Sequence, residues 1–241
     1  MPIEIHFFEE VNLEGKHLIT GFHGIGVVGY IATKFLIEET GARKIGMITS
    51  EKMPPLVSLD EEGTIQLPFE LFLDDENDFV YLLVRFSPHP SELRDFTVKV
   101  AELIEKSGMH GLILLGGLDE SYKPDDDEHG YRAVITNGFN VEGLDLDGPP
   151  LIDAGLFISG GIAMLLIELQ KRHVPSITLF PFADRENPDM VAASKAITII
   201  NQLFDIQIKT ENLMEEAKEF EEEVDQILQQ EKKKESNHIY M

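Results

Sequence analysis

The sequence contains no cysteine. Disulfide bonds, cysteine-ligated zinc, iron–sulfur clusters and thiol nucleophiles are therefore excluded. A chain without cysteine suits a reducing compartment, and we expect a cytoplasmic location. The first ten residues, MPIEIHFFEE, are acidic and lack the basic segment and apolar stretch of a secretory leader, so no leader is expected here.

Basic residues are also scarce. Twenty lysines and arginines stand against 44 aspartates and glutamates, which leaves a net charge of −24. Nucleic acids and anionic membranes bind surfaces rich in lysine and arginine, so we expect neither of them as a partner. The charge instead favours a protein partner that carries basic patches.

Long apolar runs are missing as well. The longest run, over residues 155–169, is interrupted by Ser159, Gly160 and Gly161. It falls short of the roughly 20 apolar residues that a membrane-spanning helix needs. The 241 residues, of which 43% are hydrophobic, are enough for one large domain or two small ones with a core.

Short apolar segments typical of strands alternate with segments of helical periodicity. Strands are expected at residues 3–8, 17–21, 44–49, 63–73, 79–86, 111–115, 131–136 and 175–181. Helices are expected up to about residue 39, and at residues 91–107 (capped by Ser91), 160–172 and 188–204. This alternation predicts an α/β three-layer sandwich, whose mainly parallel or mixed sheet has helices on both faces.

The chain changes character after residue 208, where apolar residues recur at steps of four and three in an otherwise acidic segment. These residues are Leu213, Ala217, Phe220, Val224 and Ile227. The pattern predicts a C-terminal helix with one narrow apolar stripe, either packed on the body or forming the seam of a homo-oligomer. We therefore divide the chain into an α/β domain (1–208), an acidic C-terminal helix (209–235) and a tail (236–241).

A glycine-rich turn lies at residues 24–29, with the sequence GIGVVG, between an expected strand and an expected helix. This is the arrangement of a dinucleotide-binding fingerprint, and His23, Gly24, Gly26 and Gly29 would then form an anion or nucleotide loop. Glycines in this position also allow a helix to pack closely on a strand. Both interpretations stay open at this point.

No catalytic or metal-binding constellation can be assembled from local spacing. The eight histidines are scattered without an HExxH pair, and Phe157 occupies the first glycine position of a G-x-S-x-G pattern around Ser159. The acidic run from Asp125 has Thr136 where a calcium loop needs a bidentate glutamate. We expect no metal, no cofactor and no enzymatic activity.

The sequence finishes with Ile239, Tyr240 and Met241. Ile239 offers an apolar anchor, and Tyr240 offers a rigid aromatic ring with a polar tip. The terminal carboxylate adds a negative charge that a lysine or a nest of backbone N–H groups can capture. These three residues are the candidate partner-binding site.

Five short motifs, in this order along residues 15–208, resemble the archaeal branch of the proteasome assembly chaperone family. They are TGFHGIGVVG (20–29), MPP (53–55), LGG (115–117), FISGG (157–161) and PD (188–189). The resemblance implies a purine-phosphorylase-like α/β sandwich and a homo-oligomer of more than two chains. It further implies that a hydrophobic-Tyr-X tail docks in pockets between proteasome α-subunits, and that motif maps onto Ile239, Tyr240 and Met241.

The resulting hypothesis is a non-enzymatic proteasome assembly chaperone, or a protein that binds the 20S proteasome through its tail. One alternative is a nucleotide-binding enzyme that uses the loop at residues 24–29. Another is an oligomeric scaffold whose tail packs on its own body.

Overall fold

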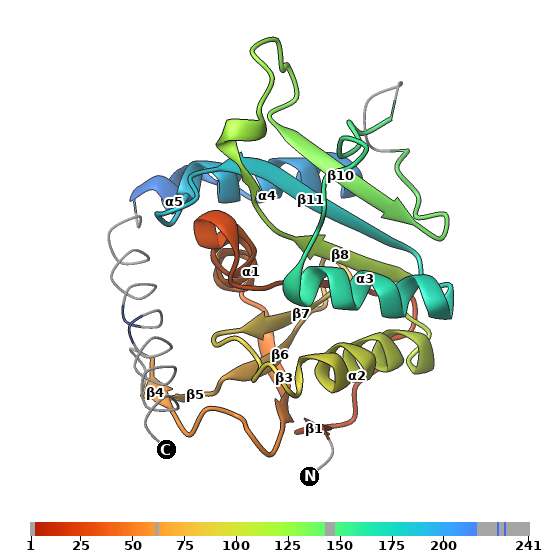
Figure 1. Ribbon diagram of the computed structural model, residues 1–241. Coiled ribbons are helices and arrows are strands. Elements are labelled where there is room, and N and C mark those ends of the chain that lie inside the picture. The colour runs from red at the N-terminus through yellow and green to blue at the C-terminus, as the bar shows by residue number, and fades with distance from the viewer. Residues whose placement is uncertain (1–2, 61–62, 143–147, 216–225, 227–228, 230–241) are drawn as a thin grey trace.

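The centre of the molecule is one mixed β-sheet (Figure 1). The structure is a computed structural model, and it describes residues 3–60, 63–142 and 148–215 together with residues 226 and 229. Its strands are β1 (Glu4–Phe7), β2 (His17–Gly21), β3 (Arg43–Thr49), β6 (Phe69–Asp74), β7 (Phe79–Val84), β8 (Gly111–Leu115), β9 (Leu118–Asp119), β10 (Tyr131–Thr136) and β11 (Ser176–Ala183). The strand order is β1-β3-β6-β7-β2-β8-β11-β10, and β9 pairs with β11.

The sheet is parallel in the middle and antiparallel on both flanks. Strands β7, β2, β8 and β11 run parallel to one another. The β1–β3, β3–β6, β6–β7 and β10–β11 pairs are antiparallel. Every residue of β7 and β8 is buried, as expected for strands covered on both faces. Of the two sheet types that the sequence predicts, the mixed one is confirmed.

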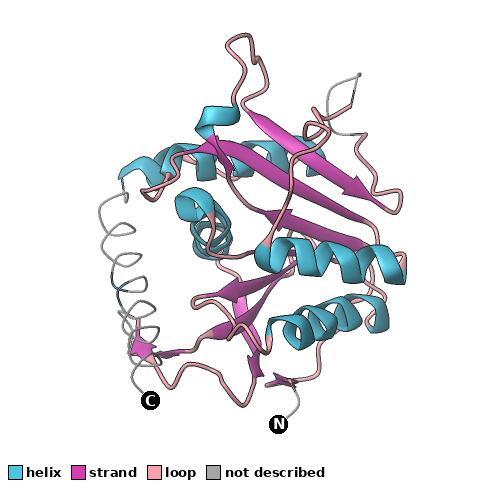
Figure 2. Cartoon of the chain, viewed as in Figure 1, coloured by secondary structure: helices cyan, strands magenta, loops and turns pink. Residues whose placement is uncertain are grey.

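Helices cover both faces of the sheet (Figure 2). On one face α1 (Val28–Glu39) packs against α4 (Met190–Phe204), and on the other α2 (Leu93–Lys106) packs against α3 (Gly160–Arg172). Each face has its own cluster of buried apolar side chains. The predicted three-layer sandwich is therefore confirmed.

The smaller elements are two 3-10 turns, a two-stranded ribbon and one short helix. They are η1 (Ile25–Val27), η2 (Glu120–Tyr122), β4 (Ser58–Leu59), β5 (Ile65–Gln66) and α5 (Glu211–Glu215). Within the described ranges, no helix is both long and apolar enough to cross a membrane.

One predicted detail is wrong, namely the cap of α2. The residue at the cap position is Glu92, which makes no capping hydrogen bond. The Ser91 hydroxyl instead accepts a hydrogen bond from Lys52 Nζ at 2.8 Å and lies 2.8 Å from His89 Nδ1. A serine is a strong cap by propensity, but here these neighbours from outside the helix engage its oxygen.

Candidate functional site

Three loops meet at the carboxyl ends of the parallel strands β2, β8 and β11. The loops contain residues 22–27, 116–117 and 184–189. A Cβ atom added to Gly117 would lie 2.3 Å from the carbonyl oxygen of Ile25. The backbone N–H of Asp189 donates to the carbonyl of Gly26 at 2.9 Å. This edge is where open α/β sheets usually bind ligands, so it is the first place to look for a site.

The glycines of the first loop are needed for packing. A Cβ atom on Gly21 would lie 2.3 Å from Gly29 Cα, and one on Gly29 would lie 2.5 Å from the carbonyl oxygen of Leu115. Gly26 has φ +62°, and a Cβ atom there would lie 2.8 Å from Ala183 Cβ. Close approach of α1 to the sheet thus accounts for Gly21 and Gly29, and the left-handed backbone together with the contact to β11 accounts for Gly26, in each case without a ligand.

Gly24 differs from the other glycines in this loop. It has φ −153°, which any residue can adopt, and a Cβ atom added to it would meet nothing within 4 Å. Gly24 is therefore the one glycine of the fingerprint that neither packing nor backbone conformation requires. Val27, which precedes α1, has the left-handed φ of 50°.

His23 lies at the outer end of a buried polar network beneath α1. Its ring packs edge-on against Tyr30, with 5.1 Å between centroids, and Tyr30 Oη lies 3.3 Å from Arg85 Nη1. Arg85 Nε is 3.2 Å from Glu70 Oε2, and Lys44 Nζ is 2.6 Å from Glu70 Oε1. Because Glu70 and Arg85 are buried, loss of Glu70 would remove the carboxylate that pairs with Arg85 in the core, whereas loss of Arg85 would leave Glu70 paired with Lys44.

The acidic residues of the third loop bind backbone groups of their own turn. Asp189 caps α4 by accepting from the N–H of Ala192 at 2.9 Å. Asp184 accepts from Asn187 and Glu186, and these hydrogen bonds hold the pKa of its carboxyl below the usual range. The part of the chain that the structure describes contains no group of three His, Asp or Glu side chains placed to hold a metal ion.

The acidic run after β9 has a comparable structural role. Asp127 pairs with Arg132 Nη1 and accepts from the N–H of Gly130 at 2.6 Å. Burial alone would raise the pKa of Asp127, but these two hydrogen bonds outweigh it and lower the pKa. The loop is thus held in place by Arg132 of the following strand, β10.

The start of the C-terminal extension is fixed on the α1–α4 face. The side chain of Asn201 holds both backbone groups of Ile208, donating at 2.8 Å and accepting at 3.0 Å. Asn212 Nδ2 donates to Glu39 Oε1 at 3.0 Å, and Leu213 is fully buried in the core of its own chain. The first residue of the predicted stripe therefore contacts the body.

The remaining residues of the stripe and tail lie outside the described residues. They are Ala217, Phe220, Val224, Ile227, Ile239, Tyr240 and Met241. The predicted seam and the predicted docking tail stay predictions, as does the division of the chain at residues 208 and 235.

Comparison with known proteins identifies the family. The model of the PAC2 family matches residues 18–228, which is most of the chain. The chain belongs to the PAC2 family. The family resemblance inferred from the sequence motifs is thereby confirmed.

Solved structures show that this PAC2 chain shares its fold with archaeal proteins over almost its whole length. PbaA of Pyrococcus furiosus, an archaeal homolog of proteasome-assembly chaperone, has a TM-score of 0.77 at 20% identity, covering 95% of this chain and 100% of PbaA. PbaB of the same organism, an archaeal proteasome activator, has a TM-score of 0.71 at 22% identity, covering 94% and 98%. An uncharacterized protein of Methanocaldococcus jannaschii is 21% identical, covering 95% of this chain and 93% of its own.

The PAC2 chain has two features that sequence reasoning missed. The first is the buried Glu70–Arg85 pair, in which Glu70 lies on β6 and Arg85 directly follows the neighbouring strand β7. The second is the apolar outward face of α3, where Ile167 is 64% exposed, together with Phe157 before the helix, which is 97% exposed. The apolar run at residues 155–169 contains the signal for the second feature, because a helix with so few polar residues has an apolar outward face.

Proposed function

We propose that this PAC2 chain is a non-enzymatic proteasome assembly chaperone or 20S proteasome-binding protein. The observation that carries the proposal is the fold shared over nearly the full length with PbaA and PbaB. A cytoplasmic location follows from that partner.

In this proposal the C-terminal tail docks in pockets between proteasome α-subunits. Ile239 fills an apolar pocket, Tyr240 adds stacking and a hydrogen bond, and Met241 completes the segment. The burial of Leu213 supports a fixed base for the extension on the body. A helix of about 24 residues that rises roughly 1.5 Å per residue would extend about 36 Å from that base.

The proposal includes a homo-oligomer of more than two chains, which presents several tails at once. Tails on one particle bind with a raised effective concentration, so several weak contacts give a strong attachment. The apolar stripe from Leu213 to Ile227 would contribute to this assembly or hold each helix to its body.

The non-enzymatic part of the proposal is supported by the structural roles of the loop residues. Gly21, Gly26 and Gly29 are accounted for by close packing, and Asp184 and Asp189 bind backbone N–H groups. Among these loop residues, packing and capping leave Gly24 and His23 without a structural reason for their residue type. The nucleotide-binding alternative therefore depends on these two residues.

Removal of the tail tests the docking mode. Deletion of residues 239–241 should abolish capture of proteasome α-subunits while leaving the fold and the oligomer mass unchanged. Tyr240→Ala should lose most of the affinity, because buried aromatic residues dominate most interfaces. Binding measured by a pull-down with purified α-subunits gives the result.

Tyr122→Ala supplies the matched control, since Tyr122 is an exposed tyrosine far from the C-terminus in sequence. It should bind α-subunits as the wild type does. Equal binding by the wild type, the truncated chain and Tyr240→Ala would contradict docking by the tail and favour contact through the body.

A further inference from the structure

Helix α3 is apolar on its outward face as well as its inward face. Gly160, Ala163, Met164 and Ile167 follow helical spacing on the outward side, where Met164 is 36% and Ile167 is 64% exposed. The inward side carries buried leucines. A helix on the surface of a protein normally turns charged or polar residues outward. The composition of α3 is that of a helix covered on both sides.

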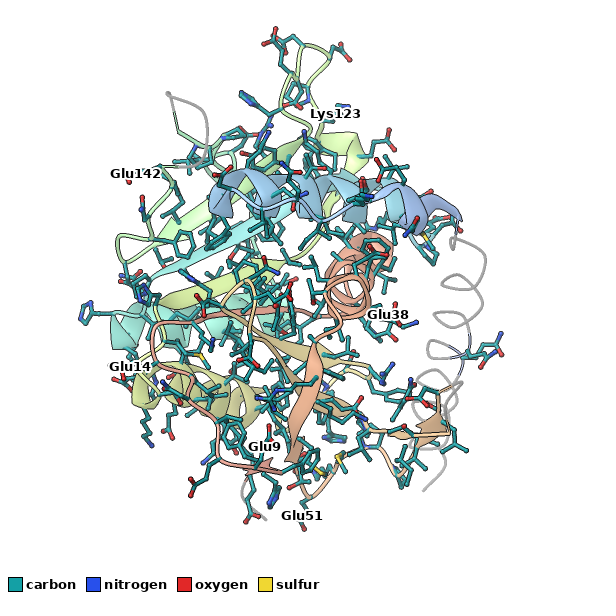
Figure 3. The ribbon with its side chains drawn as sticks, turned by 180° about the vertical axis from the view of Figure 1, so that it is seen from behind. Glu9, Glu14, Glu38, Glu51, Lys123 and Glu142 are labelled. Atoms are coloured by element: carbon teal, nitrogen blue, oxygen red, sulfur yellow. The ribbon has the colours of Figure 1, made fainter. Side chains whose placement is uncertain are left out.

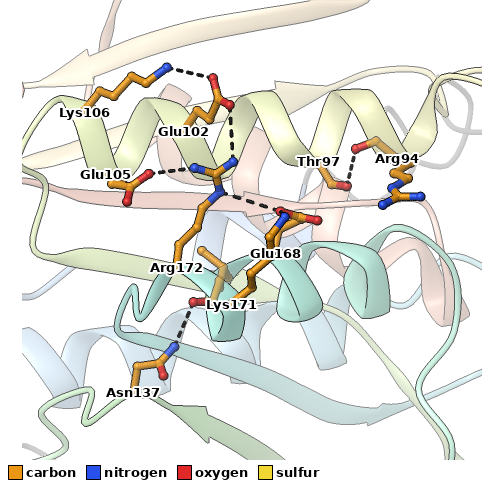
Figure 4. Close-up of polar contacts among 10 residues, drawn as sticks. Arg94, Thr97, Glu102, Glu105, Lys106, Asn137, Glu168, Lys171 and Arg172 are labelled. Atoms are coloured by element: carbon orange, nitrogen blue, oxygen red, sulfur yellow. Dashed lines mark hydrogen bonds and ion pairs between the residues drawn. The ribbon is translucent and has the colours of Figure 1, made fainter.

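The neighbouring helix α2 covers the same face of the sheet as α3, but its outward side is polar. Its exposed positions carry Arg94, Asp95, Glu105 and Lys106. Figure 4 shows α2 and α3 side by side, joined where Arg172 at the end of α3 reaches Glu105 at 2.7 Å and Glu102 at 3.2 Å. The ion pairs thus lie towards the C-terminal end of α3 and leave its first two turns apolar.

The segment that leads into α3 adds further exposed apolar residues. Phe157, three residues before α3, is 97% exposed, and Leu151 is also exposed. Leu151 lies beside β10, because it forms a parallel bridge with Ala133. Single exposed apolar residues are ordinary, but several from one segment mark an interaction surface. We call Leu151, Phe157, Met164 and Ile167 together the α3 patch.

The charge of this segment points to the partner. Residues 148–174 contain two acidic side chains, Asp153 and Glu168, and two basic ones, Lys171 and Arg172, so they contribute nothing to the net charge of −24. A second copy of the chain has the same large negative charge. Two copies therefore repel one another least where neutral surfaces face each other, whereas a basic partner would be drawn to the acidic remainder.

We propose that the α3 patch is a self-association surface that binds the α3 patch of a second copy about a twofold axis. With the axis between Ala163 and Met164 and the two helices antiparallel, Gly160 faces Ile167 of the second copy and Ala163 faces its Met164. Small residues then lie opposite large ones, which is the self-complementarity that an isologous contact needs. The same register places Phe157 opposite Gln170, in the last turn of the second copy.

This inference rests on the homo-oligomer of the proposed function, because the contact between two α3 patches would be one of the contacts that hold that oligomer together. A twofold contact closes after two chains, so a larger particle needs a second, different contact. The mass of the particle can be measured without the proteasome, and loss of α-subunit binding therefore remains a separate result.

A matched pair of exposed positions tests the surface. Ile167→Glu places a charge within the proposed contact, opposite Gly160 of the second copy. Val191→Glu places the same charge on α4 at a residue of equal exposure, 65% against 64%. Ile167→Glu should reduce the particle mass to half or less and weaken self-association by about tenfold or more. Val191→Glu should leave both unchanged. Light scattering after size exclusion and sedimentation equilibrium measure these quantities, and circular dichroism confirms that both variants fold.

The absence of cysteine allows a second test that does not depend on weakening the contact. Met164→Cys should form a covalent dimer under mild oxidation, because each residue lies close to the twofold axis, while Val191→Cys should remain mostly uncrosslinked. Higher salt should strengthen self-association by screening the repulsion between two strongly negative copies.

Four results would overturn the proposal. The first three are a monomeric wild type at tens of micromolar in about 0.15 M salt, an unchanged mass for Ile167→Glu, and equal crosslinking of the two cysteine variants. The fourth is loss of the dimer on deletion of residues 239–241, since the tail, and not contact between two α3 patches, would then hold the copies together.

Discussion

Gly26 has a left-handed backbone and no free space for a side chain, so its replacement should destabilise the fold. It has φ +62°, and an added Cβ atom would lie 2.8 Å from Ala183 Cβ and 3.1 Å from Asp189 Cβ. Gly26→Ala should lower the free energy of unfolding by about 1–3 kcal/mol, from backbone strain and from displacement of the α4 cap. Urea denaturation measures the change.

Gly24→Ala is the control within the same loop. Because Gly24 has extended backbone and open space beside it, this variant should be within about 0.5 kcal/mol of the wild type. If Gly26→Ala were equally neutral, the packing explanation of the loop glycines would be wrong.

His17 on β2 should make stability dependent on pH. Burial lowers the pKa of His17 from 6.5 to about 4, with a further decrease from His110 and an opposing increase from Asp78. The unfolded chain then binds more protons than the folded one between these values, so stability falls as the pH falls from 6.5 towards 4.

The expected loss of unfolding free energy from this histidine is about 1–2 kcal/mol between pH 6.5 and pH 5, after allowance for its partial exposure. His17→Phe keeps a ring against Phe139 and Phe204, so it should fold and show a shallower decline. The urea midpoints of the wild type and of His17→Phe are each measured at pH 7 and pH 5. Both proteins have the same carboxylates, so the difference between their two pH-dependent changes reports His17. An identical pH dependence in both proteins would assign the effect to other groups.

The anchoring of the C-terminal extension depends on one buried side chain of α5. Leu213 is fully buried, and the described part of the segment is also linked to the body by hydrogen bonds of Asn212 and Asn201 and by the partly buried Ile206 and Ile208. Leu213→Asp should release the extension without unfolding the sandwich, because terminal elements open locally at low cost. Trypsin should then cut faster after the exposed Lys209, whereas Glu211→Ala, at an exposed position, should leave the rate unchanged. No change in cleavage for Leu213→Asp would mean that the other contacts of the segment hold it without Leu213.

The helices and strands were largely predictable because their signals are local. Continuous apolar runs gave β7 and β8, and Gly41, with φ +61°, follows the end of α1 as a helix-terminating glycine does. Local signals could not decide between a parallel and a mixed sheet, because the sheet type depends on which strands become neighbours.

The features missed from the sequence depend on tertiary placement. Glu70 and Arg85 become partners only through the antiparallel β6–β7 register, which the strand pattern does not specify. For α3, a helix with apolar residues on every side indicates burial, but it does not indicate what covers it. The fold is needed to show that the described part of the chain leaves Ile167 64% exposed.

The net charge of −24 acts on the whole molecule rather than on one site. In Figure 3 the labelled acidic residues Glu9, Glu14, Glu38, Glu51 and Glu142 lie on different sides of the molecule. Negative charge distributed in this way keeps copies apart at long range and leaves the neutral α3 patch as the surface of least repulsion.

Assembly and docking should therefore be coupled through the number of tails on one particle. Ile167→Glu leaves the tail sequence intact but is expected to separate the copies, so each particle presents fewer tails. Its apparent affinity for an immobilised α-ring should fall by roughly tenfold or more, because multivalent attachment commonly exceeds single-site affinity by about 10²–10⁴. Val191→Glu, with equal exposure on α4, should bind as the wild type does. Biosensor measurements on α-rings at low surface density give the comparison. Equal affinity for Ile167→Glu and the wild type would mean that one tail, or the body itself, provides the whole attachment.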